Sequence, residues 1–278
     1  MLTNLRLVQI YAVLRLELRK TFLSRRGLWV YLLAFSPVLL FAGHSLNMLQ
    51  RGRPCDFGQD TNIFATVFHF FYLRLAIFFG CLGIFMNLFR GEVLDKSLHY
   101  YFLSPIRREV LMAGKFLAGL SAAMLIYCTS TLVQFFAMYA HYDSATLQEY
   151  LWRNHGAQHL LAYMGVTALG CLGYGSVFLA AGILLRNPII PAAVILVWES
   201  IDLFLPALLQ KFSVIYYLKS LCPIEVSVPA AGFLRLFAVN PDPVSPYIAI
   251  PGLFALAALV VLLAGLRIRK MEIRYGTD

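Results

Sequence analysis

Residues 158–185 read QHLLAYMGVTALGCLGYGSVFLAAGILL, a run without a single Asp, Glu, Lys or Arg. A helix rises 1.5 Å per residue, so this run is long enough to cross the about 30 Å of hydrocarbon in a bilayer. Other long apolar runs occupy 28–49, 65–89, 113–140, 189–209 and 247–267. In lipid, every backbone group must be paired within the protein, which such runs achieve as helices. The sequence therefore predicts an all-α polytopic membrane protein with six transmembrane helices.

The composition also favours a membrane protein. The chain has 278 residues, of which 60% are hydrophobic and 13% are charged, whereas soluble domains have about 45–50% apolar and about 25% charged residues. The first apolar run begins near Leu28 and no small-residue cleavage site follows it, so we expect no cleavable signal peptide. The five cysteines contain no CxxC pair, and we expect no metal site.

The distribution of charge predicts the orientation. Most of the 23 Lys and Arg residues fall in residues 1–27, in the connection 90–115, at Arg186 and in the tail 268–278. Under the positive-inside rule, both termini are cytoplasmic and the chain lies in the cytoplasmic (inner) membrane, in contact with its lipids. The net charge of +9 follows from this rule, so no nucleic-acid partner is expected.

Residues 1–27 carry an apolar stripe at three- and four-residue spacing, formed by Leu7, Tyr11, Leu14, Leu18 and Phe22. This spacing predicts an amphipathic helix that lies on the membrane surface as an elbow before the first span. The alternative is a basic flank that only fixes the topology.

Residues 90–115, RGEVLDKSLHYYFLSPIRREVLMAGK, connect the second and third predicted spans. Proline disfavours helix at the preceding residue, so a short amphipathic helix over about 92–103 should end near Leu103. A short exposed helix of this type fits a groove on a cytoplasmic partner. The alternative is an ordinary basic connection.

The order of features in this connection is an acidic residue, a leucine-rich helix, a Ser-Pro turn, a basic pair and Gly-Lys. It resembles the membrane (permease) subunit of type-two ABC transporters of the exporter type, although Lys96-Ser97 stand where that family often has Gly-Thr. The resemblance extends to the elbow helix, the transmembrane domain 28–267 and a long outer segment at about 210–246. It implies that residues 92–103 are a coupling helix that contacts a nucleotide-binding subunit. The implied ATPase-coupling residues are Glu92, Asp95, Leu98, Phe102, Ser104, Pro105, Arg107 and Arg108.

No GxxxxGK[ST] phosphate loop occurs in the chain. We therefore expect a non-catalytic subunit without a cofactor of its own, with ATP and Mg bound by a separate ATPase. The resemblance implies two permease copies, most simply a homodimer, on two ATPase copies. The alternatives from other classes are an integral membrane enzyme acting on lipid-linked substrates and an ion-coupled secondary transporter.

Three charged residues fall well inside predicted spans and away from their cytoplasmic ends, in places where charge is costly and is usually functional or paired. Glu199 and Asp202 lie three residues apart in the fifth span, and Arg74 lies in the second. We expect them to line the substrate path or an interface, or else to make structural contacts, with Arg74 paired to one of the acids. Cys55 and Cys222 both fall on the outer side, where a disulfide between them is possible. The proline-containing segment 210–246 predicts either short helices that dip into the outer leaflet or an ordinary outer loop.

Overall fold

The computed structural model describes residues 2–23, 27–51, 56–94, 106–185, 189–201, 205–224, 226 and 244–269. Throughout these ranges the regular elements are helices, which confirms the predicted all-α class. Five helical stretches are long and apolar enough to cross a membrane: Leu28–Gln50, Phe57–Phe89, Arg108–Met138, Gly156–Leu184 and Pro246–Arg269. They correspond to five of the six predicted spans.

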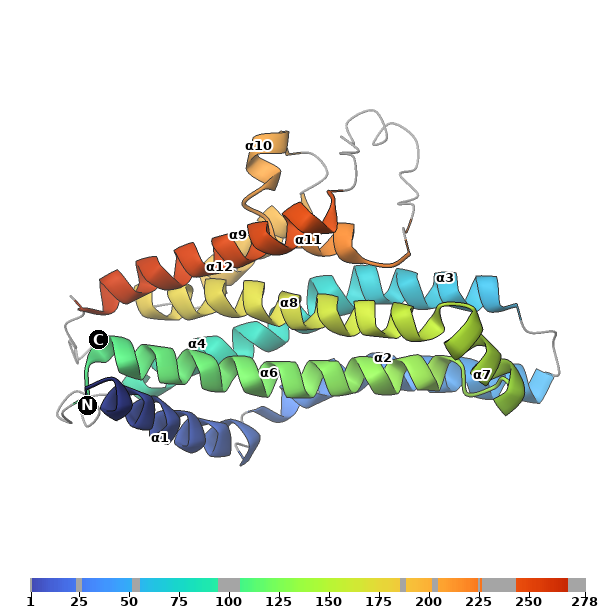
Figure 1. Ribbon diagram of the computed structural model, residues 1–278, viewed down its shortest axis with the longest axis horizontal. Helices are drawn as coiled ribbons and strands as arrows, with labels where there is room; N and C mark the ends of the chain where they lie inside the picture. The colour runs from blue at the N-terminus through green and yellow to red at the C-terminus, as the bar shows by residue number, and fades with distance from the viewer. Residues whose placement is uncertain are drawn as a thin grey trace.

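The helices follow one another along the chain as a bundle (Figure 1). The first half contains α1 (Leu2–Leu23), α2 (Leu28–Arg51), α3 (Phe57–Val67), the π-helix η2 (Phe68–Ile77), α4 (Phe78–Leu94) and α6 (Arg108–Met138). The second half contains α7 (Ser144–Arg153), α8 (Gly156–Leu184), α9 (Ile189–Ser200), α10 (Ala207–Gln210), α11 (Val214–Leu221) and α12 (Pro246–Arg269). Elements α3, η2 and α4 join without a break into one long helix.

Helix α8 forms the centre of the bundle. In its most apolar window 78% of the residues are buried, compared with 22% in α2 and in α12. Glycines on α8 allow this close packing, since a Cβ at Gly175 would overlap the Phe85 ring of α4, and one at Gly173 would overlap Val214 of α11. Small residues commonly bring membrane helices together in this way.

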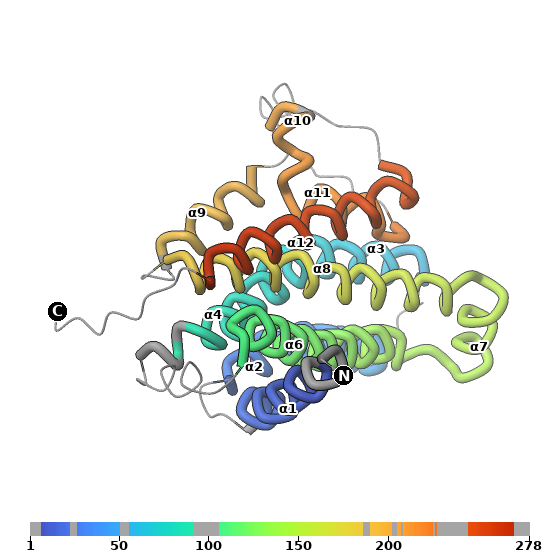
Figure 2. Tube along the Cα trace, turned by 60° about the vertical axis from the view of Figure 1, so that its left-hand side comes forward, coloured from blue at the N-terminus to red at the C-terminus, as the bar shows by residue number. Residues whose placement is uncertain are grey.

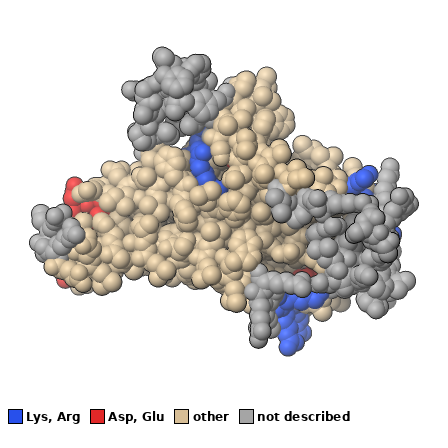
Figure 3. Space-filling view, turned by 180° about the vertical axis from the view of Figure 1, so that it is seen from behind, with Lys and Arg blue, Asp and Glu red and all other residues tan. Residues whose placement is uncertain are grey.

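Helices α2 and α12 form the outside of the bundle (Figure 2). Both present large apolar side chains outward: Leu32 and Leu39 of α2 are 75% and 78% exposed, and Leu262 of α12 is 67% exposed. Figure 3 shows one face of the molecule as a broad surface with few charges, on which most of the visible Lys and Arg lie toward one end. Such a surface matches the hydrocarbon of a bilayer.

Both described ends of the chain lie at the same end of the bundle (Figure 1). The end of α12 contacts the start of α6, because Arg269 pairs with Glu109 and the Arg108 guanidinium donates to the Arg269 carbonyl at 3.1 Å. Helix α1 also packs along the first half of α6. We call this the α6-start end of the bundle.

The predicted span 189–209 is not a single helix. Helix α9 covers 12 residues, about 18 Å at 1.5 Å per residue, which is too short to cross a bilayer alone. Helix α10 begins only after Pro206, and α11 then packs against α8 and α12. Helix α11 lies within the predicted outer segment 210–246. Residues 227–243 lie outside the described part of the chain, so both interpretations of this segment stay predictions.

The long helix α3–η2–α4 contains a π-helical segment, in which the normal i→i−4 hydrogen bonds are shifted. Two tyrosines hold this segment against α6. The Tyr72 hydroxyl donates to the Tyr127 carbonyl at 2.7 Å, and the Tyr127 hydroxyl donates to the Ala76 carbonyl at 2.9 Å. Gly80 makes room for the second contact, because a Cβ there would overlap the Tyr127 hydroxyl.

Replacing Tyr127 with Phe should lower the free energy of unfolding in detergent micelles by about 1 kcal/mol, because the Ala76 carbonyl loses a buried donor. The matched control is Tyr247→Phe, since Tyr247 is 90% exposed and should show no change. An equal effect of both substitutions would contradict the assigned contact.

Candidate functional site

The candidate site lies at the α6-start end, where three helices meet at a buried ion pair. Lys115 of α6 is fully buried, and its ammonium group donates to Glu17 Oε1 of α1 and to the Leu88 carbonyl of α4, both at 2.9 Å. The ring of Phe89 lies 5.4 Å from the ammonium nitrogen. We call Glu17, Leu88 and Lys115 the junction. Helix α4 precedes the 95–105 connection and α6 follows it. The junction joins both of these helices to the N-terminal helix α1.

The local sequence explains why α1 reaches this position. Gly114 removes the side chain that would otherwise meet Val13 and the Ile10 carbonyl, so α1 approaches α6 closely. Glu17 and Val13 form the buried face of α1, at 3% and 5% exposure. The helix itself was predicted, whereas its membrane-surface position stays a prediction.

The predicted apolar stripe of α1 is buried only in part: Leu14 and Leu18 are half-buried, and its other three residues are exposed. Leu7 and Tyr11 are both 64% exposed and Phe22 is 38% exposed. These side chains are therefore available to lipid or to another protein. In an amphipathic helix at a membrane surface, exposed apolar side chains are the part that enters the lipid.

An ion pair of this kind holds elements in register. A buried charge that keeps its partner and its hydrogen bonds is tolerated, but removal of one partner leaves an uncompensated charge at high cost. The junction therefore couples the positions of α1, α4 and α6 mechanically.

The predicted coupling residues fall on both sides of this junction. Helix α4 continues to Leu94, so Glu92 lies in its last turn, and Arg107 and Arg108 are the N-cap and first residue of α6. Asp95, Leu98, Phe102, Ser104 and Pro105 lie outside the described residues. Helix α6 begins at Arg108, before the predicted span 113–140, which places Lys115 two turns inside the helix. The coupling helix itself stays a prediction.

Glu199 lies where α9 meets α11 and is 5% exposed. Its carboxylate accepts hydrogen bonds from the Val214 and Ile215 amides at 2.9 and 2.8 Å and from the Ser213 hydroxyl at 3.0 Å. The Tyr174 hydroxyl of α8 donates to it at 3.4 Å. These amides belong to the first turn of α11, where the N–H groups have no carbonyl acceptors within the helix. Glu199 therefore acts as the N-terminal cap of α11 from another helix.

Arg74 lies in η2, and its guanidinium carbon is 6.0 Å from the centre of the Phe70 ring. Asp202 lies outside the described residues, so the predicted pairing of Arg74 with an acid of the fifth run stays a prediction. A role of these residues in a substrate path is likewise untested by the geometry.

The predicted disulfide also stays a prediction, because Cys55 lies outside the described residues. Cys222 follows α11, and its thiol donates to the Leu218 carbonyl at 3.5 Å. Burial raises the pKa of Cys222 to about 12. Since the thiolate is the reactive form, this thiol should react slowly at neutral pH.

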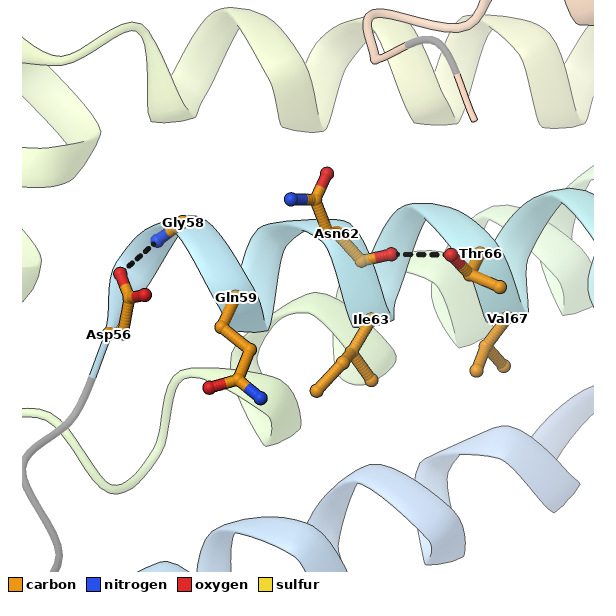
Figure 4. A pocket seen from close by; sticks show the side chains of 7 residues that line it. All are labelled: Asp56, Gly58, Gln59, Asn62, Ile63, Thr66 and Val67. Atoms are coloured by element: carbon orange, nitrogen blue, oxygen red, sulfur yellow. Dashed lines mark hydrogen bonds between the residues drawn. The ribbon is translucent and has the colours of Figure 1, made fainter. Parts of the chain in front are cut away.

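A shallow groove follows α3 at the other end of the bundle (Figure 4). Two of its polar side chains bond within the helix itself: the Asp56 carboxylate accepts from the Gly58 amide at 2.9 Å, and the Thr66 hydroxyl donates to the Asn62 carbonyl at 2.7 Å. The side chains of Asn62 and Gln59 project in different directions. The groove therefore has no converging polar groups that would define a ligand.

No protein-family profile and no curated protein matches this chain.

Sequence reasoning noted Lys115 only as part of the Gly-Lys motif and did not single out Glu17. The pairing joins positions 98 residues apart. The sequence did contain a signal for this pair. Glu17 lies next to the apolar stripe of the predicted N-terminal helix, and a carboxylate that becomes buried requires a cation nearby.

Proposed function

We propose that this chain is the permease subunit of an ABC exporter, driven by a separate ATPase. The observation that carries the proposal is the junction. The two helices that flank the 95–105 connection, α4 and α6, are joined to each other and to α1 through Lys115. A displacement of that connection by a partner would therefore be passed to three helices at once.

The course of the chain supports a sixth, partial crossing. Helices α8 and α12 both end toward the α6-start end, because Gly182 of α8 packs on Met86 of α4, and Arg269 of α12 pairs with Glu109. Residues 185–245 must therefore return the chain along the bundle before α12 begins. Helix α9 covers part of that distance, and α10 and α11 follow. Both termini would then lie in the cytoplasm, as the charge distribution predicts.

In this account ATP and Mg bind the partner, two ATPase copies serve two permease copies, and this chain provides the substrate path. Closure of the ATPase dimer would move the segment 92–103, and the junction would transmit that movement to the bundle.

The proposal is tested by the composition of the complex purified from its native membrane. We expect a phosphate-loop ATPase to co-purify in equal copy number, and Leu98→Asp to remove it by placing a charge on the apolar side of the coupling helix. Gln148→Asp, on the exposed side of α7 at the other end of the bundle, should leave the complex intact. The absence of any ATPase with the wild-type chain would contradict the proposal.

A further inference from the structure

A cavity of about 510 Å³ lies at the end of the bundle opposite the junction, where the start of α3 faces α7 and the start of α8 (Figure 1). Small-molecule sites usually have volumes of about 300–1,000 Å³. Its walls include Thr61 of α3, Glu149 of α7, His159 of α8 and Ile224, which follows α11. We call it the α3–α7 cavity. It adjoins the shallow groove of Figure 4, since Asn62 lines both.

The turn between α7 and α8 shapes this cavity. His155 has a φ of 62°, in the left-handed region, and the chain reverses its direction there. Gly156 then lets α8 start close to α7, because a Cβ at this position would overlap the Tyr150 ring. Tyr150 is 8% exposed and packs against Phe57 of α3, with ring centroids 4.8 Å apart. These two aromatic residues provide an apolar wall that three helices hold in place.

Two buried polar atoms lie on the face of α8 that packs toward α3. They are His159 Nδ1 and the Tyr163 hydroxyl, and neither has a hydrogen-bond partner among the described residues. His159 lines the cavity. Tyr163 lies one turn further along, with its ring centroid 5.0 Å from that of Phe64 in α3. Buried polar groups nearly always have a partner, from the protein, from water or from a ligand. A hydroxyl group suits both atoms, because it can donate and accept.

The other polar groups of the cavity favour an uncharged ligand. Asn62, Glu149 and Asn154 are exposed, and each amide offers both a donor and an acceptor. The described residues that line the cavity include no Lys or Arg, so a phosphate group would meet Glu149 without a cation to balance it. Glu149 already pairs with Arg153 at 3.8 Å, so it does not require a cationic ligand.

We propose that the α3–α7 cavity binds a neutral sugar ring. Such a ring carries several hydroxyl groups, which match the amides, Glu149 and His159, and apolar C–H faces, which match Phe57. The same chemistry is present in a free sugar and in the headgroup of a glycolipid. The inference goes beyond the proposed function, because binding here requires neither ATP nor a partner chain.

Saturation-transfer nuclear magnetic resonance of maltose tests binding of a free sugar to the purified chain in phosphatidylcholine nanodiscs. We expect transfer to the sugar-ring protons, and Asn62→Leu should weaken binding about two- to tenfold by removing hydrogen bonds to the ring. The matched control is Gln59→Leu. Gln59 lies three residues earlier on the same helix, projects in a different direction (Figure 4) and lines the groove but not the cavity, so binding should not change.

Native mass spectrometry of the chain in detergent tests the lipid source, with monoglucosyl diacylglycerol as the probe. The wild type should retain this lipid more than Asn62→Leu does. Binding of either probe with this dependence on Asn62 supports the sugar site and identifies its source. The site would be overturned if neither probe bound the wild type, or if Gln59→Leu weakened binding as much as Asn62→Leu. A bound probe that left the His159 Nδ1 resonance unshifted would also overturn it, by leaving an ordered water as the partner of that atom.

Discussion

The substitution Lys115→Met should lower the free energy of unfolding in detergent micelles by about 3 to 5 kcal/mol, because it leaves the Glu17 carboxylate buried without its main partner. Lys115 is fully buried, whereas Lys20, whose Nζ lies 3.5 Å from Glu17 Oε1, has a side chain that is 50% exposed. The Leu88 carbonyl loses its donor as well. Chemical unfolding followed by tryptophan fluorescence measures the loss.

Two further variants separate the charge from the packing. Lys20→Met should cost less than about 1 kcal/mol, because an exposed partner contributes little. The double variant Glu17→Met with Lys115→Met should be much more stable than Lys115→Met alone, since a buried pair replaced by apolar groups of similar size is often nearly neutral. A double variant as unstable as Lys115→Met alone would show that packing, and not the uncompensated charge, causes the loss.

The second large effect is expected at Glu199. Glu199→Ala should cost about 3 kcal/mol, because two backbone amides and a serine hydroxyl lose a charged acceptor in a buried place. Glu199→Gln should lower the free energy of unfolding by less than Glu199→Ala but remain destabilising. The glutamine NH₂ group is a donor and would face the donors that now bond to one of the Glu199 oxygens. The same unfolding measurement applies.

The control for this effect is Glu149→Gln. Glu149 has a 59% exposed side chain and forms a surface pair with Arg153 at 3.8 Å, so its loss should change stability by less than about 0.5 kcal/mol. Proteolysis between residues 201 and 213 should increase in Glu199→Ala and not in Glu149→Gln. Equal proteolysis in both variants would mean that Glu199 does not hold α11 in place.

The apolar runs predicted five of the long helices, because length and hydropathy alone decide whether a segment suits lipid. The prediction that 189–209 forms a single helix was wrong, because hydropathy does not indicate where a helix is capped and ends. Helix α9 ends near Ser200, and Glu199 caps the start of α11. The capped amides, those of Val214 and Ile215, lie 15 and 16 positions from Glu199, so this interaction depends on the fold. Helix α6 also extends beyond the apolar run 113–140, since Arg107 and Arg108 are polar and still belong to its cap and first turn.

The candidate site was predicted only in part. The 90–115 connection was singled out, whereas its link to α1 requires a pairing across the chain. The six histidines are far apart in the sequence, yet His44 Nε2 and His141 Nε2 lie 3.1 and 3.0 Å from the Asp60 carboxylate. Each of these three residues lies near the same end of a predicted span, and this shared position was the available signal.

The most direct test of the central claim is ATP hydrolysis in nanodiscs by the complex purified from its native membrane, compared with the chain stripped of partners. We predict hydrolysis by the complex, none by the chain alone, and loss of hydrolysis from the nanodiscs with Leu98→Asp. A stripped chain that transports without ATP, or that converts a lipid-linked substrate alone, would contradict the assignment as an ATPase-driven permease.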